Sequence, residues 1–247
     1  MNEDALLPAL QSALPIDLAP GVVDLASAGL IIVDEVNGFC TVGAGNLAPA
    51  EPNAQVSAMV VETDRLARIF TEANRPVLAF LDTHEPGKPE PPYPPHCELG
   101  TGEENLVPEL EWLEGADTAT LVRKDCINGF VGAIETAEDG WHHNRLTAWA
   151  NDYGLKTVLI IGICTDICVL DLVLTLLSAR NHGLMGSVRD IVVQSSACAT
   201  YDLSAEAVRE LGLPATAAHP QALTHHVGLY LMASRGAVLA SEVTFDG

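Results

Sequence analysis

TVLIIGICTDIC, residues Thr157 to Cys168, joins a run of β-branched and apolar residues to a long apolar segment that continues to Asn181. An uninterrupted apolar run ended by a turn is typical of a strand buried on both faces of a sheet. The segment from Asp166 to Asn181 is long enough for a helix, and Thr165 or Asp166 is a suitable N-cap. A buried strand that leads directly into a helix indicates an α/β domain with a parallel sheet.

The same alternation of strand and helix runs along the rest of the chain. Five more strands are predicted at Ala28–Asp34, Val77–Asp82, Thr118–Lys124, Asp190–Ser195 and Ala237–Val243. Helices are predicted at Val56–Phe70, Leu106–Leu113, His143–Tyr153, Ser204–Leu211 and Pro220–Ala233. We therefore expect one three-layer α/β/α domain with a mostly parallel six-stranded sheet at residues 25–247, after a leader or helix at residues 1–24.

The composition is that of a globular chain with a strong negative charge. Of 247 residues 48% are hydrophobic, and 12 Lys and Arg against 33 Asp and Glu give a formal net charge of -21. This excess of acid excludes nucleic acid as the expected partner, because phosphate binding depends on Lys and Arg. No apolar run reaches the roughly 18 to 20 residues of a membrane span. The opening Met-Asn-Glu-Asp lacks the basic region of a secretory signal, so we expect a cytoplasmic chain, also compatible with the nucleus, whose six cysteines stay thiols.

Four reactive side chains stand where the predicted strands end. Asp34, Asp82 and Lys124 each close a strand, and Cys168 opens the helix after another. Because parallel strands place their carboxyl ends at one edge of the sheet, where α/β domains bind ligands, we expect these groups to meet there.

Cys168 is the candidate nucleophile, since a helix N-terminus favours a thiolate and is expected to lower the thiol pKa. Asp34 is the candidate base because burial raises the pKa of a carboxyl group, and Lys124 would hold the two in register. Taken singly, each has a simpler structural explanation: a buried cysteine, a turn residue and a surface ion pair. Cys164 does not fit a zinc spacing and is interpreted as backbone scaffold.

The proline-rich loop Thr83–Gly102 carries a candidate metal site. Asp82, His84 and His96 offer a carboxylate and two imidazoles, which suit a divalent transition metal, and Glu85 or Glu90 could add a ligand. A solvated loop without metal is the alternative. The other histidines, which show no comparable grouping with acids, are predicted to be ordinary surface or core residues; they are His142, His143, His182, His219, His225 and His226.

Five motifs taken together resemble the nicotinamidase branch of the isochorismatase-like hydrolases, and are most similar to the plant type. They are Asp34-Glu-Val-Asn-Gly-Phe39, Asp82-Thr-His84, Tyr93-Pro-Pro-His96-Cys97, Arg123-Lys-Asp-Cys-Ile-Asn-Gly-Phe130 and Gly162-Ile-Cys-Thr-Asp-Ile-Cys168.

The resemblance implies roles for particular residues. Asp34, Lys124 and Cys168 would be catalytic, and the backbone amides of Cys164 and Cys168 would form an oxyanion hole after a cis peptide at Ile163–Cys164. The implied metal ligands are Asp82, His84 and His96, with zinc as the expected metal and iron or manganese as alternatives. Glu90 or water would take the place of a third histidine found in family members. Phe39 and Tyr93 would bind the substrate ring.

The implied activity is hydrolysis of nicotinamide to nicotinate and ammonia through a cysteine thioester, a step of NAD salvage. Three alternatives stay open: another amidohydrolase acting on an N-carbamoyl or ureido substrate, a non-catalytic nicotinamide-binding protein, and, more remotely, a structural zinc protein. A homo-oligomer is also left open.

Overall fold

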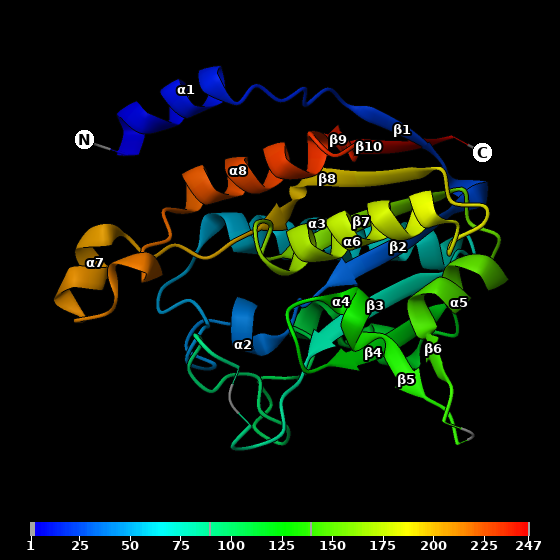
Figure 1. The fold of residues 1–247 in the computed structure, drawn as a ribbon, viewed down its shortest axis with the longest axis horizontal. Coiled ribbons are helices and arrows are strands. Elements are labelled where there is room, and N and C mark those ends of the chain that lie inside the picture. Colours follow the sequence, from blue (N-terminus) through cyan, green and yellow to red (C-terminus); the bar gives the residue numbers. More distant parts are fainter. Residues whose placement is uncertain (1–2, 89, 139, 247) are drawn as a thin grey trace.

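A computed structural model describes residues 3–88, 90–138 and 140–246, and its centre is a parallel sheet (Figure 1). The order of its six strands is β4-β3-β2-β7-β8-β9, and every neighbouring pair is parallel. The strands are β2 (Ala28–Val33), β3 (Val77–Asp82), β4 (Ala119–Lys124), β7 (Thr157–Ile163), β8 (Asp190–Ala199) and β9 (Val238–Ala240). The predicted α/β/α architecture is confirmed.

Two apolar clusters cover the two faces of the sheet. Successive residues of β2 alternate between them: Leu30 and Ile32 face one cluster, Ile31 and Val33 the other. This alternation follows from the two-residue period of a strand and explains why the central strands are apolar throughout. Each fully buried Leu or Ile stabilises the fold by roughly 1.5–3 kcal/mol relative to an exposed one.

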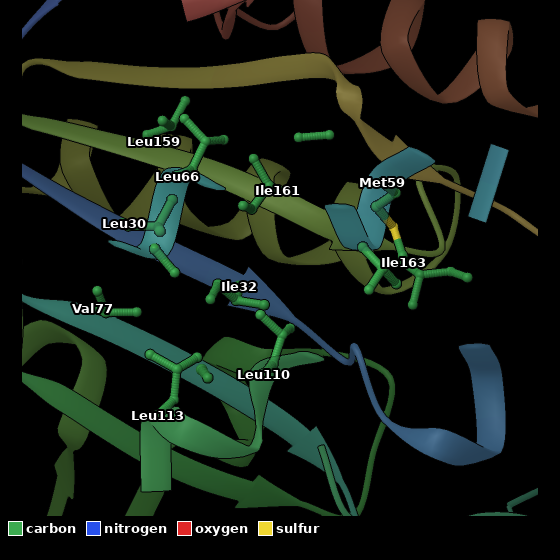
Figure 2. Close-up of a cluster of buried hydrophobic side chains, with 14 of the residues drawn as sticks. Leu30, Ile32, Met59, Leu66, Val77, Leu110, Leu113, Leu159, Ile161 and Ile163 are labelled. Atoms are coloured by element: carbon green, nitrogen blue, oxygen red, sulfur yellow. The ribbon is translucent and has the colours of Figure 1, made fainter. Parts of the chain in front are cut away.

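Helices complete the outer layers. Helix α3 (Ala54–Glu72) and the 3-10 helix η2 (Pro108–Gly115) cover the first face, where Figure 2 shows Met59, Leu66, Leu110 and Leu113 in one cluster with the strand side chains. The second face is covered by α4 (Gly129–Gly132), α5 (Arg145–Asp152), α6 (Cys168–His182) and α8 (Gln221–Ala233). None of the helices among the described residues is long and apolar enough to cross a membrane.

Several elements differ from the sequence prediction. The last predicted strand, Ala237–Val243, is two strands: β9 joins the main sheet, while β10 (Val243–Asp246) pairs with β1 (Gly21–Asp24). A small hairpin of β5 (Ile134–Thr136) and β6 (His142–Asn144) precedes α5. Helices α1 (Glu3–Ala13), α2 (Asn37–Cys40) and α7 (Ala205–Glu210) lie outside the central layers. Because all five of these strands have only three or four residues, their apolar patterns are too short to recognise.

The predicted cap of the long helix was also wrong. Helix α6 begins at Cys168, and Ile167 occupies the N-cap position without a side-chain hydrogen bond. The Asp166 carboxylate does not cap the helix because it bonds Thr200 and His219 instead.

The order of the strands creates a switch point beside β2. The chain runs from β2 outward through β3 and β4, then returns to the other side of β2 with β7. In open parallel sheets such a reversal leaves a crevice at the carboxyl ends of the strands. Asp34, Asp82, Lys124 and the segment before Cys168 all lie at this edge.

The close contact between β2 and β7 depends on Gly162. A methyl group at this position would lie 2.2 Å from the backbone oxygen of Val33, and its φ of +123° is unusual for other residues. We expect Gly162→Ala to lower the free energy of unfolding by more than about 3 kcal/mol, measured by urea denaturation.

Gly183→Ala is the matched control. Gly183 also has a positive φ, at +86°, but open space surrounds it, so the loss should stay near 1 to 2 kcal/mol. Equal losses in the two variants would contradict the role given to the β2–β7 contact.

Candidate active site

Asp34 directly follows β2 and turns the chain out of the sheet. Its φ is 54°, a conformation that aspartate adopts more readily than most residues. Its amide donates to the Phe80 carbonyl at 3.0 Å, which ties the turn to β3. The carboxyl group is completely buried; Lys124 Nζ lies 2.8 Å from Oδ2, although neither oxygen has a hydrogen-bond partner of good geometry among the described residues. Burial raises the pKa of Asp34 to about 7, against the opposing effect of Lys124.

Lys124 lies at the end of β4, opposite Asp82 in the register of β3 and β4. Its side chain is fully buried; Nζ donates to Asp82 Oδ1 at 2.8 Å and to the Cys126 carbonyl at 3.0 Å, in addition to its approach to Asp34. Burial would lower the pKa of this amine, but Asp34, the Cys168 thiol and Asp82 together hold it well above the ordinary value. Lys124 is therefore a cation between two carboxyl groups.

Cys168 is the first residue of α6, and 8% of its surface is exposed. Burial raises its thiol pKa well above the usual value, and Lys124 opposes this shift. The sequence-based expectation of a lowered pKa is wrong, because desolvation outweighs the helix N-terminus. Electrostatic interactions with both Asp34 and Lys124 place the three groups together. The arrangement thus pairs a neutral thiol with a carboxyl group that can accept a proton near neutral pH.

A second cluster joins this one through Asp82. Its Oδ2 lies 3.0 Å from His84 Nε2 and 3.2 Å from His96 Nε2, and all three residues are buried. Burial would raise the pKa of Asp82, but Lys124 and the two imidazoles hold it well below the ordinary value. Asp82 is therefore ionised and shared between the two clusters.

The donor set of this second cluster fits a divalent metal. One ligand atom each from Asp82, His84 and His96 lies within 4.8 Å of the others. The Nδ1 of His96 lies 2.8 Å from the Pro94 carbonyl, so this nitrogen carries a proton, and Nε2 faces Asp82. An imidazole nitrogen this close to a carboxylate oxygen needs a proton or a cation between the two, so the cluster is suited to hold either protons or a metal ion. Hydrogen bonding of the second ring nitrogen is also the usual way in which a ligating histidine is oriented.

The two glutamates considered as extra ligands are placed differently. Glu90 Oε2 lies 3.6 Å from Nε2 of both His84 and His96, while its Oε1 accepts the Ile127 amide at 3.0 Å. Glu85 is exposed and does not belong to the described Asp82–His84–His96 cluster.

Two aromatic rings lie beside the Asp82–His84–His96 cluster. The Phe39 ring centroid lies 5.7 Å from that of His96, and the Tyr93 centroid lies 6.0 Å from it. Both rings are half-buried. Burial raises the pKa of Tyr93 to about 12, and Cys168 and Cys164 add to the shift, so Tyr93 lies near these cysteines as well as beside His96. The structure thus brings together the candidate residues of the two clusters and the two aromatic rings, whereas Glu85 lies apart from them.

The segment from Ile163 to Cys168 crosses the edge of the site. Its Ile163–Cys164 peptide bond is cis, as expected. The Cys164 carbonyl accepts the amides of Ile167 and Val169, which closes a tight turn. Since Cys168 starts α6, its own amide is among the helix donors without an intrahelical acceptor.

Sequence reasoning missed two histidines beside this segment, the buried His219 and the half-buried His225. His219 pairs with Asp166 at 2.7 Å, and His225 Nδ1 lies 2.8 Å from Thr165 Oγ1. They were predicted to be ordinary surface or core residues because no acid adjoins them in sequence. The signal available in the sequence was the polar dipeptide Thr165-Asp166, which lies inside the motif that carries the candidate nucleophile and needs polar partners.

An acid, an amine and a thiol gathered at the carboxyl edge of a parallel sheet define a site suited to hydrolysis through a cysteine. The family model of the isochorismatase domain matches residues 28–220. The chain belongs to the isochorismatase family. It is 49% identical over 247 residues to Nicotinamidase 1 of Arabidopsis thaliana, and the alignment covers 99% of each chain.

Solved structures share the fold at lower identity. A pyrazinamidase/nicotinamidase from Streptococcus mutans is 21% identical with a TM-score of 0.62, over 86% of this chain and 99% of that one. An N-carbamoylsarcosine amidase from Thermoplasma acidophilum is 20% identical with a TM-score of 0.58, over 87% of this chain and 95% of the other. At these identities the likeness concerns the fold.

Glu35, the residue after Asp34, is a completely buried acid whose protonation state can be tested. Its Oε1 accepts the Thr63 hydroxyl at 2.6 Å, and Oε2 has no partner among the described residues. Burial raises the pKa of Glu35 to about 8, so between pH 4.5 and 8 the unfolded chain releases this proton while the folded chain keeps it. Stability therefore falls as pH rises through this window.

Glu35→Gln removes that proton linkage. We expect its free energy of unfolding to equal that of the wild type near pH 4.5 and to exceed it by on the order of several kcal/mol at pH 8, by urea denaturation. A difference between variant and wild type that does not change with pH would refute a protonated Glu35.

Proposed function

We propose that this chain is a nicotinamidase, which hydrolyses nicotinamide to nicotinate and ammonia and so serves NAD salvage. The observation that carries the proposal is the buried contact of Lys124 with Asp34 and Asp82, which joins a thiol–carboxyl pair to a metal-binding cluster. The 49% identity to Nicotinamidase 1 over the whole chain supports the choice of substrate.

Asp34 and Cys168 carry out the proton transfers in this mechanism. Asp34 accepts the thiol proton as the sulfur attacks the carboxamide carbon, and the oxygen of the tetrahedral intermediate takes the negative charge. Asp34 returns the proton to the departing ammonia, leaving a thioester. Water then attacks the thioester, gives a proton to Asp34 and releases nicotinate, and that proton returns to the sulfur. A base with a pKa of about 7 suits both directions of transfer.

The backbone and Lys124 stabilise charge during these steps. The amides of Cys164 and Cys168 would donate to the oxyanion, and the second lies at a helix N-terminus. Lys124 keeps a positive charge beside Asp34 and the sulfur, which stabilises the thiolate as it forms.

Asp82, His84 and His96 would hold one divalent metal, with zinc favoured by two imidazoles and one carboxylate and with iron or manganese as alternatives. The bound ion supplies a Lewis acid that can hold a pyridine nitrogen and orient the ring. Glu90 lies near enough to both histidines to complete the set directly or through water. Phe39 and Tyr93 would contact the ring of the substrate from either side of His96.

The direct test is ammonia release from nicotinamide by the purified protein, before and after a chelator, together with metal analysis. We expect release that the chelator diminishes and one metal per chain. A metal-free protein active on N-carbamoyl substrates but not on nicotinamide would assign the site to another amidohydrolase.

Cys168→Ala removes the proposed nucleophile. We expect ammonia release to fall by more than about 1,000-fold, because the remaining groups cannot form the thioester. Cys198→Ala, at a buried cysteine of β8 that is not one of the candidate site residues, is the control and should keep activity within about threefold. Turnover that survives in Cys168→Ala would rule out the covalent route.

His96→Ala removes a metal ligand that also contacts both aromatic rings. We expect KM for nicotinamide to rise by about 10- to 100-fold and kcat to change less, because the group positions the substrate. His182→Ala, exposed at the end of α6, should leave both constants unchanged. A fall in kcat at constant KM would contradict the positioning role.

The pH profile reports on Asp34. Since its pKa is raised to about 7, the carboxylate form needed to accept the thiol proton is lost as pH falls through that value. We expect kcat/KM to decline roughly tenfold per pH unit on the acid side of about pH 7. A profile that stays flat down to pH 5 would show that another group acts as the base.

A further inference from the structure

Asp166 lies in the middle of the segment that carries both candidate oxyanion donors, two residues from Cys164 and two from Cys168. Its carboxylate points away from α6. Oδ1 accepts the Thr200 hydroxyl at 2.7 Å, and Oδ2 lies 2.7 Å from His219 Nε2. The acid is ionised, because the hydrogen bonds and the charge of His219 outweigh burial and lower its pKa.

His219 faces an acceptor on each side of its ring. Nε2 lies against the Asp166 carboxylate, and Nδ1 lies 2.9 Å from the Tyr201 carbonyl. A neutral imidazole can donate from only one nitrogen, so both contacts are satisfied only by the doubly protonated ring. The Tyr201 ring stacks on this imidazolium at 3.8 Å with an angle of 14°, and His219 is only 8% exposed.

The other titratable groups near the pair do not compete with it. Among the described residues they are Tyr201, Cys164, His225 and Tyr93, and Tyr93 is neutral at pH 7 because burial raises its pKa to about 12. Burial raises the pKa of Tyr201 and raises that of Cys164 to about 12, so both are neutral at pH 7. Burial lowers the pKa of His225 to about 4, which leaves it neutral beside Thr165.

The segment is also fixed by packing on both sides. The Thr165 amide donates to the Ala199 carbonyl at the end of β8. Helix α8 approaches so closely that a methyl group at Gly228 would lie 2.8 Å from Asp166 Cα. The turn is thus packed between β8 and α8, and the Asp166–His219 ion pair is an additional, charged contact that fixes it.

We propose that Asp166 and His219 form a charged pair that positions the Cys164–Cys168 turn, so that the two backbone amides stay aimed at the oxyanion. The inference rests on the proposed function and adds two positioning residues to it. Neither side chain touches the substrate; both act through the backbone of the turn. Their loss should therefore weaken the transition state more than the bound substrate.

His219→Ala tests this inference by steady-state ammonia release from nicotinamide. We expect kcat to fall by about 10- to 100-fold while KM stays within about twofold, because a displaced amide costs less than a deleted one. His219→Gln keeps a donor that can reach Asp166 and should recover part of the loss. The double variant Asp166→Asn/His219→Ala should be no slower than the slower single variant, since both changes break one contact.

The control is His226→Gln on α8, the helix that follows His219 in the chain. His226 is buried like His219, but its Nε2 bonds the Leu14 carbonyl instead of the turn, so kcat should match the wild type. An unchanged kcat in a folded His219→Ala, or a rise in KM alone, would overturn the positioning role.

Nitrogen-15 NMR of the wild-type histidines separates this inference from the proposed function. We expect both His219 nitrogens to be protonated at pH 7, whatever substrate the enzyme uses. A neutral His219 ring overturns the charged pair. A wild type that releases no ammonia while His219 is doubly protonated overturns the proposed function and keeps the pair.

Discussion

The ion pairs of Lys124 hold the site together. An amine completely removed from solvent is costly unless anionic groups surround it, and here Asp34 and Asp82 approach Nζ at 2.8 Å each. The three residues lie at the ends of three adjacent strands. The ion pairs therefore depend on the order of strands in the sheet, and the sheet depends on the ion pairs. Removal of the amine would leave two buried carboxyl groups facing each other, and removal of Asp82 would detach the metal cluster from the thiol.

The unequal partners of the two carboxyl groups explain why they behave differently. Asp82 receives the Lys124 amine and two imidazoles, and remains an anion. Asp34 has one amine and the neutral Cys168 thiol close by, together with the repulsion of Asp82, so burial dominates and its proton is held to about neutral pH. One acid is thereby suited to be a fixed charge and the other to accept a proton in the proposed mechanism, although they lie at the ends of neighbouring strands.

The sheet could be predicted from the sequence because buried parallel strands are apolar throughout. The meeting of side chains at the strand ends could be predicted because the carboxyl ends of parallel strands share one edge. Asp34, Asp82, Lys124 and Cys168 could be predicted for this reason. The Asp166–His219 pair could not, since 53 residues separate its members and neither closes a strand. The thiol pKa was also misjudged: proximity to a helix end is visible in a sequence, whereas the extent of desolvation is not.

Asp82 belongs to both clusters of the site, the one around Lys124 and the one with His84 and His96. This shared position of Asp82 would limit which ions the second cluster can bind. Its Oδ1 is already committed to an amine, so it offers an incoming ion a single, partly neutralised oxygen. Hard ions such as magnesium or calcium, which depend on several fully anionic oxygens, gain little from such a ligand. Ions of borderline softness draw most of their binding energy from the two nitrogens and tolerate it well. The arrangement proposed to tune proton transfer would thereby also select which element is bound.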